Sequence, residues 1–264
     1  MAAWQHVLIT GASAGLGQAL ALAVAAPGAV LHLSGRDAGR LGAVAKACRA
    51  RGASVLPQVV DARDASAMAA WIGGAGRLDL VIANAGISAG TGGAVEPAGT
   101  ARAVFETNVD GVLNTVLPAL AAMAAQPPGA DGLRGRIGVV ASVAAFVAAP
   151  GAPAYCASKA AVQRWAEALD ATEQRRGIRL HAICPGYIRT AMTARNDFPM
   201  PFLMSAEEAA WRTLAGIAAG RTRIAYPWPV YWAARLLGAL PPGLRAAAFN
   251  RLPAKAADPG LGQG

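Results

Sequence analysis

The sequence predicts an α/β fold, a doubly wound parallel sheet with helices on both faces. Short runs rich in β-branched and aliphatic residues alternate with longer Ala- and Leu-rich segments of helical period. A glycine-rich loop directly follows the first short run and precedes the first helical segment. Hydrophobic residues make up 55% of the 264 residues and charged residues 15%, so the chain can bury a substantial core and is not disordered.

The expected elements follow from this alternation along the chain. Strands are expected at residues 6–10, 30–34, 54–60, 78–83, 136–141 and 179–184, with a seventh near 223–226. Helices are expected at residues 16–26, 38–51, 65–72, 100–125 and 155–176. Asp37 is placed to cap the second helix and Gly177 to close the last one. No internal repeat or linker interrupts the order, so we expect one domain over residues 1–264.

Two stretches depart from the alternation. Residues 187–204 are rich in Pro, Met and Phe and follow the C-terminal end of a strand, the edge at which parallel sheets bind ligands. Residues 227–253 hold Trp228, Tyr231, Trp232, Leu236, Leu237, Leu240 and Phe249 among Arg235, Arg245 and Arg251. This spacing suits one or two short amphipathic helices that pack on the body of the protein. A dimer contact, a lid over the substrate and attachment to a membrane surface are the alternatives.

Composition argues against several classes of protein. The most apolar stretches, 19–26 and 139–149, are shorter than the roughly 20 residues that a membrane span needs. No basic region precedes a hydrophobic segment at the N-terminus, so no signal peptide is expected. Cys48, Cys156 and Cys184 lack metal-ligand spacing, which predicts reduced thiols, a cytoplasmic protein and no metal site.

The net charge of +9 raises the question of a nucleic-acid partner. The basic residues are nearly all arginines, scattered along the chain without an aromatic-interleaved cluster. A basic surface serves an anionic cofactor equally well. We therefore expect no nucleic-acid binding.

The first candidate site is the loop Thr10-Gly11-Ala12-Ser13-Ala14-Gly15-Leu16-Gly17. Its three glycines remove the Cβ atoms that would block a diphosphate, and the following helix offers free N–H groups to that anion. The position between a strand and a helix predicts dinucleotide binding. A tight turn without a ligand is the alternative.

The second candidate site is Tyr155 and Lys159, four residues apart in Tyr-Cys-Ala-Ser-Lys. On a helix this spacing places phenol and ammonium on one face, about 5–6 Å apart at Cβ. The ammonium favours the phenolate and would bring the tyrosine pKa, normally near 10, closer to neutral pH. In isolation the pair indicates only a surface contact, but together with the glycine loop it indicates acid–base catalysis.

With these motifs the chain resembles the short-chain dehydrogenase/reductase family, in its compact single-domain branch. Further motifs agree in order, namely Asn84-Ala85-Gly86, Asn108, Ser142, and Pro185-Gly186 followed by Thr190. The resemblance covers about residues 5–226 and leaves 227–264 as a C-terminal extension. It implies a Rossmann-type sheet of about seven strands and a homodimer or homotetramer.

The resemblance also implies site residues. Tyr155 is the expected acid and base, Lys159 its pKa modulator and a ligand of the nicotinamide ribose, and Ser142 the holder of the substrate oxygen. Asn108 is expected to support a water that relays protons toward Lys159. The expected cofactor contacts are Gly11, Ser13, Gly15, Leu16, Gly17, Arg36, Asp61, Ala62, Asn84, Gly86, Tyr155, Lys159, Pro185, Gly186, Ile188 and Thr190.

The end of the second strand predicts the choice of cofactor. Arg36 stands where an arginine accommodates the 2′-phosphate of NADP, whereas an acidic residue there selects NAD. Asp37 is better explained as a helix cap. Ala14 replaces the second basic residue that the family often uses, so NADP is expected with NAD as an alternative and with moderate selectivity.

The expected activity is the interconversion of a ketone or aldehyde and an alcohol by hydride transfer. Phe198, Met200, Pro201, Phe202, Leu203 and Met204 suggest an apolar lid, which suits a lipophilic substrate. Two alternatives stand beside this activity. One is an NADP-binding sensor without turnover, and the other is a peripheral membrane or assembly role of the tail.

Overall fold

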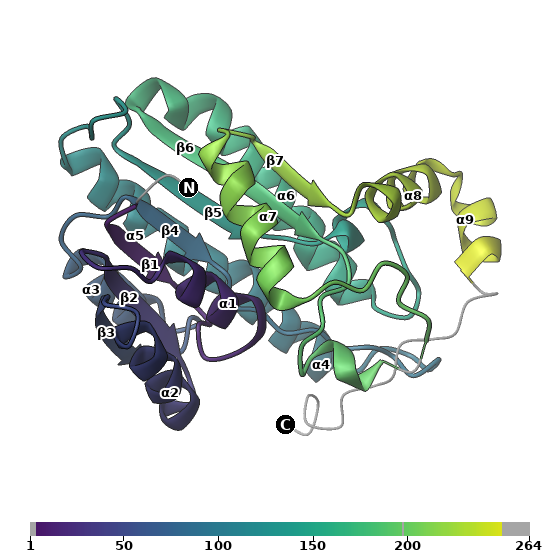
Figure 1. The fold of residues 1–264 in the computed structure, drawn as a ribbon. Coiled ribbons are helices and arrows are strands. Elements are labelled where there is room, and N and C mark those ends of the chain that lie inside the picture. The colour runs from purple at the N-terminus through teal and green to yellow at the C-terminus, as the bar shows by residue number, and fades with distance from the viewer. Residues whose placement is uncertain (1–3, 197, 250–264) are drawn as a thin grey trace.

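The central sheet has seven parallel strands in the order β3-β2-β1-β4-β5-β6-β7. The computed structural model describes residues 4–196 and 198–249 (Figure 1). The strands are β1 (His6–Ile9), β2 (Val30–Gly35), β3 (Ser54–Val59), β4 (Leu80–Ala83), β5 (Gly135–Val140), β6 (Ile178–Pro185) and β7 (Arg223–Tyr226). The order reverses between β1 and β4, which opens a crevice for a ligand at the C-terminal edge of the sheet. The predicted doubly wound fold and its seven strands are confirmed.

Helices cover both faces of the sheet. The α-helices of the described residues are α1 (Gly15–Val24), α2 (Ala38–Arg49), α3 (Ala65–Gly73), α4 (Ala98–Phe105), α5 (Gly111–Ala125), α6 (Pro153–Glu173), α7 (Ala206–Ala218), α8 (Trp228–Ala239) and α9 (Pro242–Phe249). Alternate residues of β1 serve the two layers, because successive side chains of a strand point to opposite faces. Val7 and Ile9 pack with α1, α2 and α7, while Leu8 packs with α3, α5 and α6.

The helix that the sequence predicts at 100–125 forms as a continuous helix, Ala98–Ala125, with one local irregularity. A single π turn, Glu106–Asp110, separates α4 from α5. The whole segment Ala98–Ala125 is long and apolar enough to cross a membrane by length and composition. Its α5 part instead contributes Val112, Val116 and Met123 to the core on the side of the sheet covered by α3, α5 and α6. We therefore regard it as a core helix of the α/β fold.

Helix α7 is missing from the prediction. Much of its buried face is made of small residues such as Ala209 and Ala210, whereas Trp211 is exposed, so the apolar pattern along the sequence is weak. The signal that identifies the helix is its N-terminal cap. Ser205 accepts a hydrogen bond from the backbone N–H of Glu208 at 3.1 Å, as Ser-x-x-Glu predicts.

Both helix ends that the sequence singles out are confirmed. The Asp37 carboxylate accepts the Arg40 backbone N–H at 2.9 Å and caps α2. Gly177 has φ +74°, the left-handed conformation that ends a helix and for which glycine carries no Cβ penalty. Two short helices, α8 and α9, form in the tail. Residues 250–264 of the expected extension, including Arg251, lie outside the described residues.

Asp170, which is 3% exposed, ties the end of α6 to the start of β6 and to the turn before β7. Its carboxylate accepts Arg179 at 2.8 and 3.0 Å, the Leu180 N–H at 2.9 Å and the Thr222 hydroxyl at 2.7 Å. Burial alone would raise the pKa of this carboxyl, but these hydrogen bonds hold the pKa below its usual value.

We expect Asp170→Asn to lower the free energy of unfolding by about 2–4 kcal/mol near neutral pH, because the partly buried Arg179 guanidinium loses its carboxylate partner. The folded-state pKa is lower than the unfolded one, so the stabilisation exists above the unfolded pKa of about 4 and is lost as the pH falls through the folded pKa. Urea unfolding at several pH values measures both effects. Glu207→Gln, at an exposed position, is the control. A difference that stays constant into acid would contradict this account.

Candidate functional site

The predicted site residues gather at the C-terminal edge of the sheet. The glycine loop follows β1, Asn84–Gly86 follow β4, Ser142 follows β5, and Pro185 ends β6 (Figure 1). Helix α6 brings Tyr155 and Lys159 to the same edge through contacts with Ser142 and with the Val140 carbonyl. Residues far apart in the chain thus surround the crevice between β1 and β4.

The glycine loop packs directly on the end of β4. A Cβ atom on Gly11 would lie 2.9 Å from the Ala85 Cα, and one on Gly17 would overlap the Gly11 carbonyl oxygen. The Asn84 side-chain amide donates to the Thr10 and Gly11 carbonyl oxygens at 3.0 and 3.1 Å. Asn84 therefore holds the loop in place, and only glycine fits at positions 11 and 17.

The N-terminus of α1 is left open for an anion. Ala14 stands at its cap position without a side-chain hydrogen bond, and the first turn holds no acidic residue. The first N–H groups of a helix carry partial positive charge and bind phosphate oxygens when no side chain occupies them. Leu16 is buried in the core, and a Cβ on Gly15 would lie 3.0 Å from the Thr190 Cγ2 atom. These residues fit a dinucleotide diphosphate.

The end of β2 presents Arg36 beside this loop. Arg36 is exposed, and its charge lowers the pKa of Asp61 across the adjoining strand end. Asp37 is committed to the α2 cap and to an ion pair with Arg40 at 2.8 Å. Ser13 packs against Gly35, where a Cβ atom would lie 3.0 Å from the serine Oγ. The acidic side chain next to Arg36 is thus turned toward its own helix.

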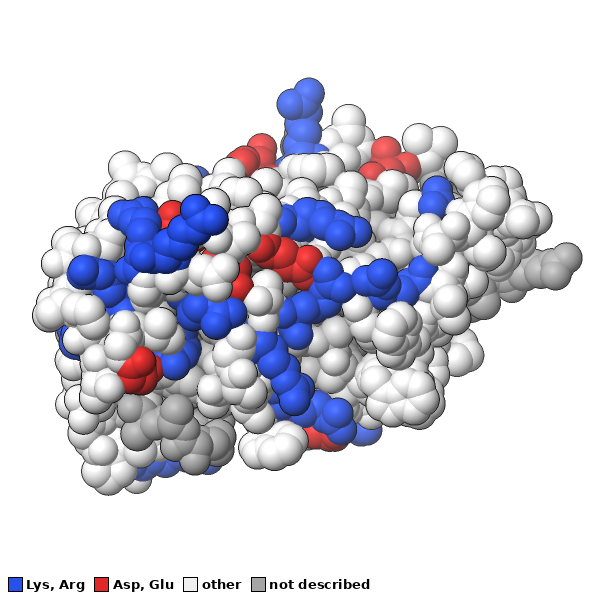
Figure 2. Space-filling view, turned by 90° about the horizontal axis from the view of Figure 1, so that it is seen from above, with Lys and Arg blue, Asp and Glu red and all other residues white. Residues whose placement is uncertain are grey.

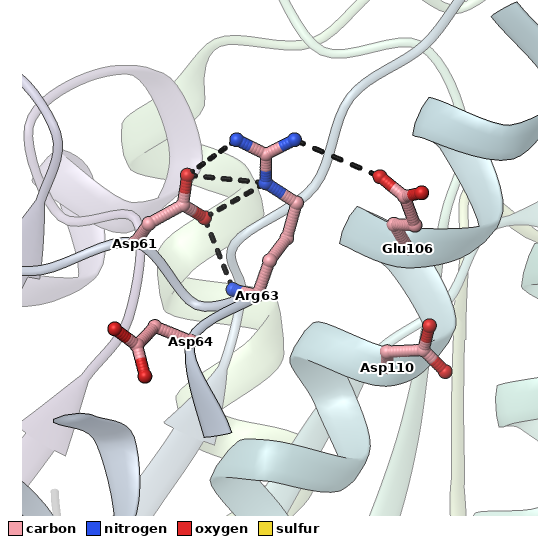
Figure 3. Close-up of a pocket in the computed structure, with 5 residues that line it drawn as sticks. All are labelled: Asp61, Arg63, Asp64, Glu106 and Asp110. Carbon is pink, nitrogen blue, oxygen red and sulfur yellow. Dashed lines mark hydrogen bonds and ion pairs between the residues drawn. The ribbon is translucent and has the colours of Figure 1, made fainter. Parts of the chain in front are cut away.

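A pocket of about 350 Å³ lies beyond the end of β3, lined by Asp61, Arg63, Asp64, Glu106 and Asp110 (Figure 3). Both oxygens of Asp61 accept hydrogen bonds from Arg63, the shortest at 2.7 Å, and this contact is the main reason for the lowered pKa of Asp61. Arg63 also approaches Glu106 at 3.7 Å. The sequence predicts Asp61 here but not Arg63, whose signal is an arginine two residues after a strand-end aspartate. Ala62 is buried beside them.

Tyr155, Lys159 and Ser142 form one cluster. The Lys159 side chain is 4% exposed, donates to the Val140 carbonyl oxygen at 2.8 Å, and places its Nζ 6.0 Å from the centre of the Tyr155 ring. Ser142 is buried, hydrogen-bonds the Tyr155 phenol, and accepts the Ala144 backbone N–H at 3.1 Å. The predicted proximity of these three side chains agrees with the geometry.

The acid–base balance of this cluster differs from the expectation. Burial raises the pKa of the Tyr155 phenol, and the hydrogen bond with Ser142 only partly offsets this rise. Burial also lowers the pKa of Lys159 to about 8. The sequence predicts a tyrosine pKa lowered by the lysine charge, but in the structure removal from water is the larger effect for both groups.

Asn108 lies in the π turn and is fully buried. Its amide accepts the Ile87 N–H at 2.8 Å and donates to the Ile87 carbonyl at 3.0 Å and to the Ser158 hydroxyl at 3.1 Å. Ser158 in turn donates to the Tyr155 carbonyl at 2.9 Å. A Cβ on Gly86 would lie 3.1 Å from the Asn108 Oδ1 and 3.3 Å from the Lys159 Nζ, so both atoms border the space above Gly86.

The loop after β6 closes over the same edge. The Gly186 backbone N–H donates to the Tyr226 carbonyl oxygen at 2.7 Å. A hydrogen bond from the Arg189 N–H to the Met204 carbonyl oxygen, at 2.9 Å, joins the two ends of the loop. Ile188 is buried and pairs with Met204 through a parallel β-bridge. The Tyr187 ring packs edge-on against Phe198, with ring centres 6.0 Å apart.

Tyr187 and Ser158 are site residues that the sequence reasoning missed. Burial raises the pKa of the Tyr187 phenol, and the Cys156 thiol acts on the pKa of both Tyr187 and Tyr155. The signal for Ser158 is its spacing of three from Tyr155, since a helical serine often bonds a preceding carbonyl.

Helix α8 presses on the short 3₁₀ turn Val143–Phe146, which begins directly after Ser142. The Tyr231 ring meets the Phe146 ring edge-on at 5.2 Å. A Cβ on Gly238 would overlap the Phe146 carbonyl oxygen, so the helix and the turn are in close contact. Arg223 anchors this contact through Glu167 at 2.5 Å and through the Tyr231 hydroxyl at 2.9 Å. Helix α8 therefore packs against the turn that directly follows Ser142.

Comparison with known sequences shows clear relatives. A family model described as short chain dehydrogenase matches residues 5–198. An uncharacterized oxidoreductase of Myxococcus xanthus (strain DK1622) is 35% identical over 256 residues, which cover 94% of this chain and 98% of that protein. The similarity therefore extends through α7 and into the tail.

Solved structures show the same fold. A short chain dehydrogenase/reductase from Burkholderia phymatum in complex with NAD has a TM-score of 0.80 at 24% identity, covering 96% of this chain and 98% of that one. A short-chain dehydrogenase from Sphingobium yanoikuyae in complex with NADPH has a TM-score of 0.77 at 26% identity, again covering 96% and 98%.

The lowered pKa of Lys159 predicts a pH-dependent stability. Between its folded pKa of about 8 and an unfolded value of about 10.4, only the unfolded chain binds the proton, so the free energy of unfolding rises with pH there. Relative to Lys159→Met, the wild type should gain about 3 kcal/mol across this window. Urea unfolding from neutral to alkaline pH measures the gain, with exposed Lys46→Met as the control. Parallel curves for wild type and Lys159→Met would refute it.

Proposed function

The chain belongs to the short chain dehydrogenase family, and from this premise we propose that it is an NADP-dependent oxidoreductase acting on a lipophilic ketone, aldehyde or alcohol. One observation carries the proposal. Ser142, Tyr155 and Lys159 form a cluster, with Ser142 and Lys159 buried and Tyr155 partly exposed, at the same sheet edge as a helix N-terminus free of a side-chain cap. The cluster suits proton transfer and the helix terminus suits a diphosphate.

The glycine loop and Arg36 support NADP. A bound nicotinamide dinucleotide would supply or accept the hydride, and the protein supplies its orientation. The α1 N-terminus, with Ser13, would hold the phosphates, and Arg36 the 2′-phosphate. Asp37 is engaged in its helix cap and so does not offer the acidic side chain that selects NAD. The structures of the same fold from Sphingobium yanoikuyae and Burkholderia phymatum are complexes with NADPH and with NAD respectively.

Proton transfer is assigned to Tyr155. Because its pKa is raised, the phenol keeps its proton at neutral pH and can give it to the carbonyl oxygen during reduction. Ser142 hydrogen-bonds this phenol and would hold the same substrate oxygen. Lys159 would stabilise the phenolate left behind, since its pKa of about 8 keeps it mostly charged at neutral pH. Asn108 would fix the geometry through Ser158, and the space above Gly86 suits a water that returns the proton.

The substrate class follows from the loop after β6. Tyr187 and Phe198 pack against each other, and the side-chain amide of Asn196 contacts the Met200 sulfur at 3.4 Å. Tyr187, which lies close enough to Tyr155 to act on its pKa, leads from the cluster to the apolar side chains of Phe198 and Met200, and these favour a lipophilic substrate over a charged one.

We further propose a single domain, assembled as a homodimer or homotetramer and located in the cytoplasm. Within the described residues Cys48, Cys156 and Cys184 are buried and not joined by disulfides, which accords with a reducing compartment.

Replacement of Tyr155 tests the activity. NADPH oxidation would be followed against a panel of ketones, aldehydes and quinones. We expect Tyr155→Phe to lose about 10²–10⁴-fold in kcat while NADPH still binds, because the proton donor is gone. Tyr187→Phe, which removes a neighbouring hydroxyl, should retain most activity. Binding of NADPH without turnover of any substrate by the wild type would favour the sensor alternative, and failure to bind either nicotinamide cofactor would overturn the proposal.

Replacement of Arg36 tests the cofactor choice. Arg36→Ala removes a charged partner of the 2′-phosphate, and we expect KM for NADPH to rise about 10–100-fold while KM for NADH changes little. Arg40→Ala is the matched control, since Arg40 is held by Asp37. Equal effects on both cofactors would show that Arg36 does not read the phosphate.

A further inference from the structure

Helix α8 turns an apolar stripe toward solvent. Trp228, Trp232 and Leu236 stand four residues apart and are 71%, 52% and 68% exposed. This spacing places them in a row on one side of the helix. Leu244 of α9 is 62% exposed as well. We call these four residues the tail face. A helix that packs on a protein normally presents polar residues on this side.

The tail face cannot turn inward, because the opposite side of α8 is fixed. Ala234 is buried, the Tyr231 ring lies against Phe146, and Gly238 touches the Phe146 backbone so closely that no Cβ fits. The Tyr231 hydroxyl accepts from Arg223 at 2.9 Å, and Arg223 pairs with Glu167. The exposure of the tryptophans is therefore a consequence of the packing, and an exposed apolar row of this kind marks a contact surface.

The surroundings of the tail face are positively charged. Residues 227–249, which contain α8 and α9, hold two arginines, Arg235 and Arg245, and no Asp or Glu. Arg235, exposed at the border of the stripe, lies 5.9 Å from the centre of the Trp232 ring, and Arg245 donates to the Gly238 carbonyl at 3.3 Å. Figure 2 shows Lys and Arg side chains mainly over the left and centre of that face, while its right-hand end is nearly free of charged side chains of either sign. The border of the tail face is therefore basic through Arg235 and Arg245, which suit an anionic partner.

Two partners compete for an apolar row of this kind, a second copy of the chain and a lipid surface. A twofold contact through the tail face would bring Arg235 and Arg245 of both copies into one interface, and residues 227–249 provide no carboxylate to pair with them. Tryptophan beside arginine is instead the composition of helices that lie in the headgroup region of anionic bilayers. The charge thus favours lipid.

We propose that the tail face docks the protein on an anionic lipid surface. Trp228, Trp232, Leu236 and Leu244 insert at the level of the acyl-chain boundary, and Arg235 and Arg245 meet the phosphates. Because α8 rests on the turn 143–146, docking brings the segment after Ser142 to about one helix diameter, roughly 10 Å, from the lipid. A lipophilic compound dissolved in the bilayer then lies near the site. The proposal does not depend on the assigned reaction.

Cosedimentation of the full chain with vesicles tests the proposal. One vesicle is phosphatidylcholine alone and the other contains phosphatidylglycerol and phosphatidylcholine in equal parts. We expect binding to the mixed vesicles that weakens as salt is added, and little binding to the neutral ones. The triple variant Trp228→Ser, Trp232→Ser, Leu236→Ser should bind about tenfold or more weakly, since it loses the inserted apolar area. Arg235→Gln should bind more weakly to the mixed vesicles only.

Trp211→Ser is the matched control, because Trp211 is 57% exposed on α7 and lies outside the tail face. Thermal unfolding and NADPH binding verify that each variant folds. Unaltered vesicle binding by the triple variant, or no binding by the folded wild type, would overturn the proposal. So would a triple variant that changes only the molecular mass in solution, which would identify the tail face as a contact between copies.

Discussion

The site depends on backbone approach at the start of the chain. Strand β1, helix α1 and the end of β4 converge at Gly11 and Gly17, where a Cβ atom would collide with the Ala85 backbone or the Gly11 carbonyl. The Asn84 side chain fills the remaining space and bonds two loop carbonyls. This contact fixes the direction of α1, and therefore where its uncapped N–H groups point. Gly86 follows two residues after Asn84, and the Asn108 and Lys159 side chains both approach it.

Burial governs the chemistry of the cluster at that edge. Lys159 reaches the Val140 carbonyl from α6 with almost no exposed surface, and its pKa falls to about 8. The same removal from water raises the pKa of Tyr155. Under the proposed function, the protonated Tyr155 phenol would be the proton donor, and the Lys159 ammonium would stabilise the resulting anion. Asn108 supports this arrangement indirectly, since its amide is bound to Ile87 and Ser158.

The C-terminal helices connect this chemistry to the surface. Glu167 on α6, Arg223 on β7 and Tyr231 on α8 form one hydrogen-bonded group that presses α8 on the turn after Ser142. One side of α8 therefore packs on the turn after Ser142, and its other side carries the exposed tryptophans. The same packing that positions Ser142 leaves the tail face exposed among the described residues 4–196 and 198–249, so the site and the proposed lipid contact share one support.

Local signals in the sequence determined much of this protein. The strand positions, the Asp37 cap, the Gly177 helix end and the glycine loop follow from periodicity and backbone sterics, which act within a few residues. They failed for α7, where small residues face the core and a tryptophan faces water. Only the tertiary structure decided the approach of Arg63 to Glu106, the contact of Gly238 with Phe146, and the direction of the pKa shifts. These join residues distant in the chain or depend on how much water surrounds a charge, and neither quantity is contained in local spacing.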